Sequence, residues 1–183
     1  MAHRYLLPLF SIIIFSSHNH DGCRAKTGLE LRVRHDRPDG NLPRPGFANV
    51  LGTTQNDFFD NLTGGVTVTG GAGAVDHFAL AANVLNSASI PTITNYSSSI
   101  GEAIDLSALL DAKFGPGSNP ATASNFVAVK EDAGGNSATL EINVNGTPGG
   151  TFVAAAHLGG VHSGDIVTAI LDHAHTTAQL HAA

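Results

Sequence analysis

Apolar and polar positions alternate with the two-residue period of β-strands along much of the chain beyond residue 46. Residues 66–68, 77–80 and 92–96 each combine β-branched or aromatic residues with polar neighbours, and glycine, serine or asparagine follows them. This pattern predicts three short strands separated by turns.

A longer alternation predicts a β-hairpin. Residues 126–130 and 138–144 alternate on either side of segment 131–137, which is polar and contains two adjacent glycines. In the second strand, Leu140 and Ile142 would lie on the packed face, and Glu141 and Asn143 on the wet face.

Two segments have apolar spacing that suits short helices. Residues 104–114 contain apolar side chains that can share a face, and Ser107 is available as an N-cap. Residues 165–175 place Ile166, Val167 and Ile170 at offsets that also share a helical face.

Composition agrees with a fold dominated by strands. Hydrophobic residues make up 42% of the 183 residues and charged residues only 13%, tryptophan is absent, and 21 residues are glycine. We therefore expect a folded chain of short strands and turns rather than long amphipathic helices.

Charge divides the chain near residue 46. Seven of the nine basic residues precede it, whereas two lysines and eleven acids follow it, a net charge of −9. Such a surface repels nucleic acid and anionic lipid and suits divalent cations. Cys23 is the single cysteine, so the fold cannot contain an intramolecular disulfide.

The first 45 residues read as a separate segment. Residues 5–15 resemble the apolar region of a signal peptide and are too short for comfortable membrane insertion, and an incidental start is the equal alternative. Residues 37–45 have the proline and glycine content of a linker. We expect disorder here, a glycine-rich repeat region at 46–80, and a further domain at 81–183.

Residues 70–80 are similar to the glycine-rich nonapeptide of parallel β-rolls, G-G-x-G-x-D-x-U-x, through Gly70, Gly71, Gly73 and Asp76. Residues 52–59 and 64–65 form a second, more degenerate copy around Asp57. In such repeats, turn carbonyls and the aspartate bind Ca²⁺, and the glycines permit the tight turn. Two copies are too few to build an independent calcium roll.

The order of motifs over residues 50–180 resembles the C-terminal target domain of type I secreted RTX proteins. The glycine motif is followed by Thr92–Tyr96, then by residues 101–110 (Gly-Glu-Ala-Ile-Asp-Leu-Ser-Ala-Leu-Leu), the hairpin, and a final apolar segment. Asn95, Tyr96 and Glu102 depart from the family's Asp, Phe and Asp.

This resemblance implies a mainly β fold, in which degenerate β-roll turns lead into a small antiparallel β domain with one or two short helices. It also implies an extracellular bacterial protein without catalytic activity, exported by a type I secretion ABC transporter complex that reads a C-terminal signal. Calcium is the implied cofactor, and its expected ligands are Asp57, Gly71, Gly73, Asp76, Asn95, Glu102 and Asp105.

Simpler roles compete with calcium binding. Asp57 and Asp76 could cap the backbone of their own glycine-rich turns, an alternative of equal weight. Asp105 suits the entry to a helix slightly better than a metal site. The histidines at 157, 162, 173 and 175 lack the spacing of a zinc site, so we expect incidental, solvated side chains.

Two other functions compete with the export module. One is a β binding module or adhesin fragment exported by the Sec system through residues 1–20. The other, weaker, is a histidine-dependent metalloenzyme; the chain contains no G-x-S-x-G, H-E-x-x-H or Walker motif, and we expect no enzyme activity.

Overall fold

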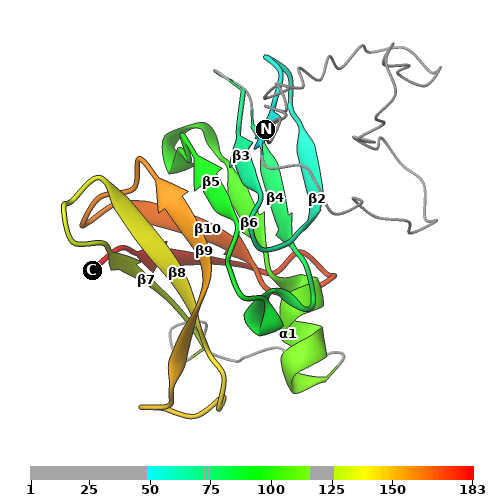
Figure 1. The fold of residues 1–183 in the computed structure, drawn as a ribbon, viewed down its shortest axis with the longest axis vertical. Helices are drawn as coiled ribbons and strands as arrows, with labels where there is room; N and C mark the ends of the chain where they lie inside the picture. Colours follow the sequence, from blue (N-terminus) through cyan, green and yellow to red (C-terminus); the bar gives the residue numbers. More distant parts are fainter. Residues whose placement is uncertain (1–48, 72, 74, 116–125) are drawn as a thin grey trace, which may run out of the picture.

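The computed structural model describes residues 49–71, 73, 75–115 and 126–183 (Figure 1). Within them the strands form two mixed sheets, which confirms the mainly β fold. The six-stranded sheet contains, from one edge to the other, β1 (Asn49–Leu51), β3 (Thr67–Thr69), β5 (Thr92–Thr94), β9 (Phe152–Gly159), β8 (Ser137–Asn143) and β7 (Val127–Glu131). The five-stranded sheet contains β11 (Thr177–His181), β10 (Ile166–Ile170), β6 (Ala103–Asp105), β4 (His77–Leu80) and β2 (Phe58–Leu62).

The first six strands alternate between the two sheets. β1, β3 and β5 pair in parallel in one sheet, and β2, β4 and β6 pair in parallel in the other. Paired residues in successive turns are 18 to 26 positions apart. The chain therefore winds as a two-sheet roll, and strands from 46–80 and 81–183 share both sheets.

Apolar side chains stack from turn to turn between the two sheets. Val50, Val68 and Ile93 occupy paired positions in one sheet, and Phe59, Phe78 and Ile104 in the other. All six are buried, and the rings of Phe59 and Phe78 stack with their centroids 5.2 Å apart. Burial of each such side chain contributes about 1.5–3 kcal/mol, so this stack is the core of the roll.

The C-terminal half adds antiparallel strands to the roll. β7, β8 and β9 run antiparallel, and β9 joins β5 in parallel. The predicted hairpin is thus confirmed as β7 and β8, with Leu140 and Ile142 buried. The prediction that Asn143 lies on the solvent-facing side of the strand is wrong. Asn143 is completely buried, and its side chain forms hydrogen bonds with the backbone of Thr147 and Asn145.

The first predicted helix is present but shorter. The helix α1 spans Ser107–Phe114, and Ile104 lies in β6. Leu106 rather than Ser107 occupies the N-cap position. The Asp105 carboxylate instead accepts a hydrogen bond from the Ser107 amide at 2.8 Å, so Asp105 stabilises the helix entry. Two 3-10 turns, η1 (Val84–Asn86) and η2 (Ser98–Ile100), complete the elements.

The second predicted helix, at 165–175, is wrong. Ile166–Ile170 form β10, between β6 and β11. Val167 and Ala169 are completely buried whereas Ile166 and Thr168 are less so, the alternation of a strand. Beyond it, the Asp172 carboxylate accepts the amides of Ala174 and Thr176 and closes a turn.

Several predictions concern residues outside the described part of the chain, namely the signal-like segment 5–15, the linker 37–45 and disorder before residue 46. Among the described residues, no helix combines the length and apolarity needed to cross a membrane.

Tyr96 connects the two sheets near the third turn. Its amide donates to the carbonyl of Gly159 in β9, and its buried hydroxyl donates to the carbonyl of Glu102 and accepts the amide of Thr168 in β10. Burial raises the pKa of Tyr96 to about 12, so the hydroxyl keeps the proton that it donates.

Replacement of Tyr96 by Phe should lower the free energy of unfolding by about 1–3 kcal/mol, because the buried Glu102 carbonyl and the partly buried Thr168 amide lose their partner. Urea denaturation measures the change. Ser97→Ala is the control, since its hydroxyl makes an exposed hydrogen bond with the Ser99 hydroxyl; we expect a change within about 0.5 kcal/mol. Equal stabilities of the two variants would contradict this role.

Candidate functional site

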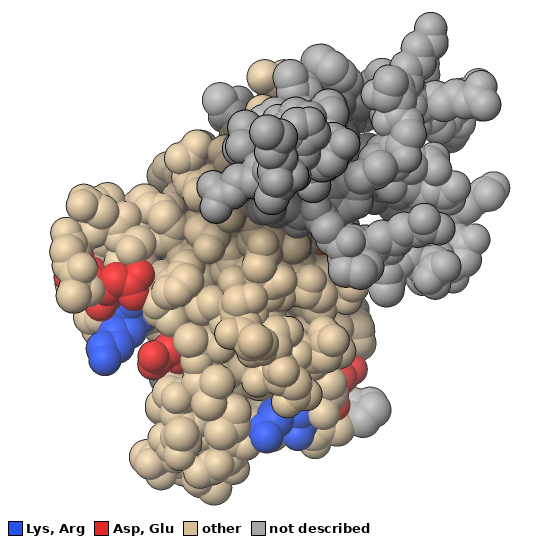
Figure 2. Space-filling view, viewed as in Figure 1, with Lys and Arg blue, Asp and Glu red and all other residues tan. Residues whose placement is uncertain are grey.

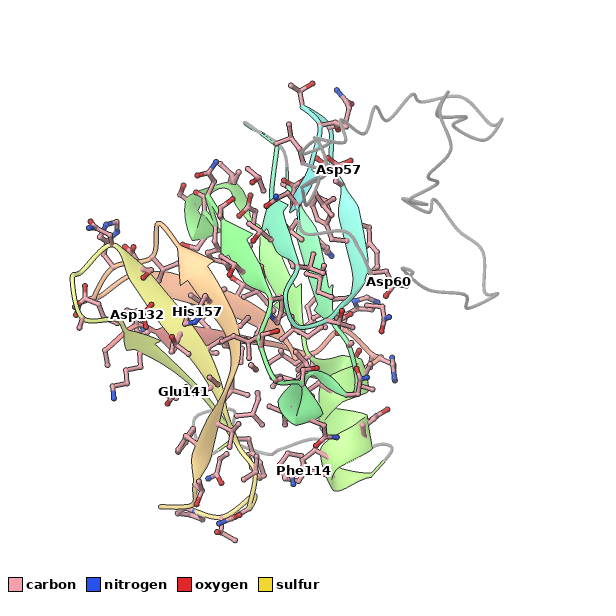
Figure 3. All side chains as sticks on the ribbon, viewed as in Figure 1. Asp57, Asp60, Phe114, Asp132, Glu141 and His157 are labelled. Carbon is pink, nitrogen blue, oxygen red and sulfur yellow. The ribbon has the colours of Figure 1, made fainter. Side chains whose placement is uncertain are left out.

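Three buried acids stand in line along the roll. Asp57, Asp76 and Glu102 immediately precede β2, β4 and β6, whose first residues are paired in register. Their exposed fractions are 4%, 0% and 1%. We call these three side chains the acid ladder; Figure 3 shows Asp57 at the start of β2.

Each acid of the ladder accepts a backbone amide from the loop that precedes its own strand. Asp57 Oδ2 accepts the amide and hydroxyl of Thr53 at 2.5 and 2.9 Å. Asp76 Oδ2 accepts the amide of Gly71 at 2.8 Å, and Glu102 Oε2 accepts that of Ser97 at 2.6 Å. Asp76 Oδ1 also accepts the amide of Asp57 at 2.9 Å, so Asp76 links two turns.

The carboxylates of Asp76 and Glu102 converge over Gly70. A Cβ atom on Gly70 would lie 2.7 Å from Asp76 Oδ2 and 3.3 Å from Glu102 Oε1. Among buried side-chain oxygens and nitrogens of the described residues, Glu102 Oε1 alone has no hydrogen-bond partner. Glycine at position 70 therefore leaves room for two neighbouring carboxyl groups.

Burial and mutual repulsion alter the protonation of this pair. Burial, together with the charge of Asp76, raises the pKa of Glu102 to about 7, although the Ser97 amide opposes the change. Burial also raises the pKa of Asp76; the amides of Asp57 and Gly71 oppose this, and the charge of Asp57 adds to it. The inner end of the ladder thus holds protons at a higher pH than exposed acids do.

The structure brings only part of the expected calcium set together. The Gly71 amide belongs to the acid ladder as a donor, and Gly73 lies in the adjoining turn with a φ of +76°. Asn95 follows β5 as Gly70 follows β3, but Asn95 is exposed, with a φ of +60°. Asp105 lies at the other end of β6 from Glu102, beside the helix.

These residues do not fit a calcium shell in the arrangement described. Calcium takes six to eight oxygen ligands, whereas both oxygens of Asp76 and one of Glu102 accept backbone amides. Within the described ranges, no group of three or more His, Cys, Asp or Glu residues is placed to hold a metal ion. The hydrogen bonds are those that the turn-capping alternative predicts, and calcium binding stays a prediction.

A second polar cluster lies on the outer face of the six-stranded sheet. The Asp132 carboxylate accepts the hydroxyls of Thr139 and Ser137 at 2.6 and 2.7 Å, and Thr139 Oγ1 lies 3.1 Å from His157 Nδ1. Because the Thr139 proton points to Asp132, His157 Nδ1 must donate to Thr139. These bonds, and to a lesser extent the charge of His157, lower the pKa of Asp132.

This second polar cluster borders an open concavity of about 630 Å³, which is lined by residues of β7, β8 and their turn, Lys130 and Glu141 among them. Figure 2 shows acidic and basic side chains gathered over this hairpin, whereas most of the visible surface carries no charge. Figure 3 places Asp132, Glu141 and His157 in this part of the molecule, away from Asp57. The sequence signal was the polar alternation of Ser137, Thr139 and Glu141 along β8.

Two other histidines each lie beside one carboxylate. His162 Nδ1 lies 3.4 Å from Asp165, and His173 Nε2 lies 3.0 Å from Asp111. No zinc cluster is placed among the described residues.

Comparisons with known proteins find no match to a protein-family model, to a curated protein or to a solved structure. The geometry above is therefore the basis for any function.

Gly71→Ala should destabilise the fold by about 1–3 kcal/mol. A Cβ atom on Gly71 would lie 1.3 Å from the carbonyl oxygen of Thr53, so two backbone loops would have to separate. Gly159→Ala is the matched control, because its Cβ atom would meet no atom closer than 3.5 Å. Urea denaturation compares them, and equal midpoints would show that the loops are not in contact.

Stability should fall as the pH rises from about 4.5 to 7. The folded pKa of Glu102 lies above its ordinary value of 4.5, so the folded state binds the proton more tightly and gains from it at low pH. The free energy of unfolding should be lower by about 3 kcal/mol above pH 7, because each unit of pKa difference between the folded and unfolded states corresponds to about 1.36 kcal/mol.

Glu102→Gln should remove this part of the pH dependence and stabilise the protein at pH 8, whereas Glu141→Gln, on the half-buried surface of β8, should keep the wild-type profile. Asp76 contributes in the same direction in all three proteins. Urea denaturation at pH 5 and pH 8 measures the difference. A wild-type profile that rises with pH would contradict the assignment to Glu102.

Proposed function

We propose that residues 49–183 form the C-terminal export and folding module of a type I secreted, RTX-like protein. One observation carries the proposal: a roll of parallel turns continues, through shared sheets, into antiparallel strands that end with the last residues of the chain. This is the architecture that the order of sequence motifs implies for such a module.

The acid ladder supports the roll half of the proposal. The acids of successive turns occupy equivalent places, and each closes a loop that begins with a glycine or asparagine, Gly52, Gly70 or Asn95. Degenerate glycine-rich turns can therefore stack with carboxylate-to-amide hydrogen bonds. No step of the proposal depends on calcium.

The C-terminal segment supports the export half. Residues 177–183 contain no Asp, Glu, Lys or Arg, and they include the final strand of the module, β11 (Thr177–His181). An ABC transporter complex would read this region in the unfolded chain, and the module would fold outside the cell. The protein has no catalytic role in this proposal.

Export of a reporter fused to the N-terminus of the chain tests the proposal in cells that express a type I transporter. We expect the reporter in the medium with the full chain, and at least a tenfold loss, roughly one step of 1.4 kcal/mol in recognition, when residues 120–183 are deleted. Deletion of residues 1–48 is the control and should preserve export. Export that persists without 120–183, or that requires 1–48, would contradict the proposal and favour Sec export.

A further inference from the structure

Asp76 ties together two neighbouring turns of the roll. Its side chain is completely buried. Oδ1 accepts the amide of Asp57, which belongs to the preceding turn, at 2.9 Å, and Oδ2 accepts the amide of Gly71, in the loop before Asp76 itself, at 2.8 Å. In a glycine-rich calcium roll, a cation between stacked turns makes the corresponding connection. In this roll one side chain makes it with hydrogen bonds.

The loops present amide donors to the acid ladder. Its carboxylates accept backbone amides from four residues, namely Thr53, Asp57, Gly71 and Ser97. Asp57 Oδ2 also accepts the hydroxyl of Thr53. A calcium site needs carbonyl and carboxylate oxygens directed at one point. Amide protons directed at the same carboxylates carry positive partial charge, so they compete with a cation for these oxygens.

Two other members of the expected calcium set lie apart from the ladder. The carboxylate of Asp105 accepts the amide of Ser107 at the entry to α1, at the opposite end of β6 from Glu102. Asn95 is exposed, with a left-handed backbone φ of +60°. A cation at the ladder would thus draw on carboxylates that already hold the loops together.

We infer that the acid ladder replaces the metal of a calcium roll: the roll folds without calcium, and the carboxylate of Asp76 rather than a cation connects its turns. The inference concerns the cohesion of the roll and does not depend on the proposed function. It changes the regulation that the motif resemblance implies, because external calcium is then not the signal that folds the turns. It also gives the inner acids different roles, since Asp76 accepts two amides and Glu102 accepts one.

Isosteric exchange of the two inner acids separates a hydrogen-bonded ladder from a cation site. In Asp76→Asn, the new side chain can accept one of the two amides and turns its own NH2 group toward the other. This exchange should raise the unfolding equilibrium constant about 10- to 100-fold. In Glu102→Gln, the new side chain keeps an oxygen for the Ser97 amide and removes a like charge beside Asp76. This exchange should lower the constant at pH 8 about tenfold or more.

Asp60→Asn is the matched control, because it makes the same exchange at an exposed position of β2. The unfolding constant should then change about twofold or less. Urea denaturation of the full-length chains at pH 8 measures all three variants. Shifts of Asp76→Asn and Glu102→Gln in the same direction, or a value for Asp76→Asn equal to that of the control, would overturn the inference.

Calcium itself provides the second measurement. The unfolding constant of the wild-type chain should agree within about twofold between CaCl2 and MgCl2 at the same concentration, since both salts screen the acidic surface equally. At tens of millimolar, calcium exceeds the dissociation constants of extracellular calcium modules. A site at a hundred times its dissociation constant would lower the unfolding constant about hundredfold.

Such a calcium-specific gain in stability would overturn the inference. The comparison needs the wild-type chain alone, so it decides even if Asp76→Asn fails to fold. A gain that the wild-type chain shows and Asp76→Asn lacks would identify a cation, rather than the amides, as the partner of Asp76.

Discussion

The roll depends on carboxylates that hydrogen-bond the backbone of its loops. Each turn leaves one sheet, crosses to the other and must satisfy partly buried backbone amides of its loop. Asp57, Asp76 and Glu102 supply the acceptors at equivalent places in three successive turns. Without them the loops would bury unpaired amides, at about 1–3 kcal/mol each.

This solution has an electrostatic cost. Stacking turns in register also stacks their acids, and like charges in a water-poor interior disfavour ionisation. Asp76 offsets part of the cost by accepting two amides, whereas Glu102 accepts one and has an oxygen with no partner. Glu102 is therefore the member whose charge is least compensated, and proton binding there stabilises the folded state most. The longer side chain of Glu102 also allows it to reach toward Gly70 from the third turn.

Local patterns predicted much of the fold, and long-range pairing decided the rest. The strand 77–80 and the hairpin were predictable because their alternation fits only a half-buried strand. Residues 165–175 were mistaken for a helix because the offsets of Ile166, Val167 and Ile170 suit either structure; pairing with β6 and β11, distant in sequence, favours the strand. Asn143 was placed on the wet face because strand alternation takes no account of the loop that folds over it.

The candidate site shows the same division. Glycine spacing identified Asp57 and Asp76, and a motif resemblance identified Glu102, so the members of the acid ladder were predictable while their partners were not. The choice between a cation and a backbone amide as partner depends on how far each loop curls back toward its own carboxylate, which the approach of Gly71 to Thr53 sets here.

That approach couples the two halves of the molecule. Loops tight enough to give their amides to the ladder bring β2, β4 and β6 into register, and β6 in turn positions β10, on which the C-terminal strand is laid. The C-terminal strand β11 is therefore connected, through β10 and β6, to the strands that the acid ladder precedes.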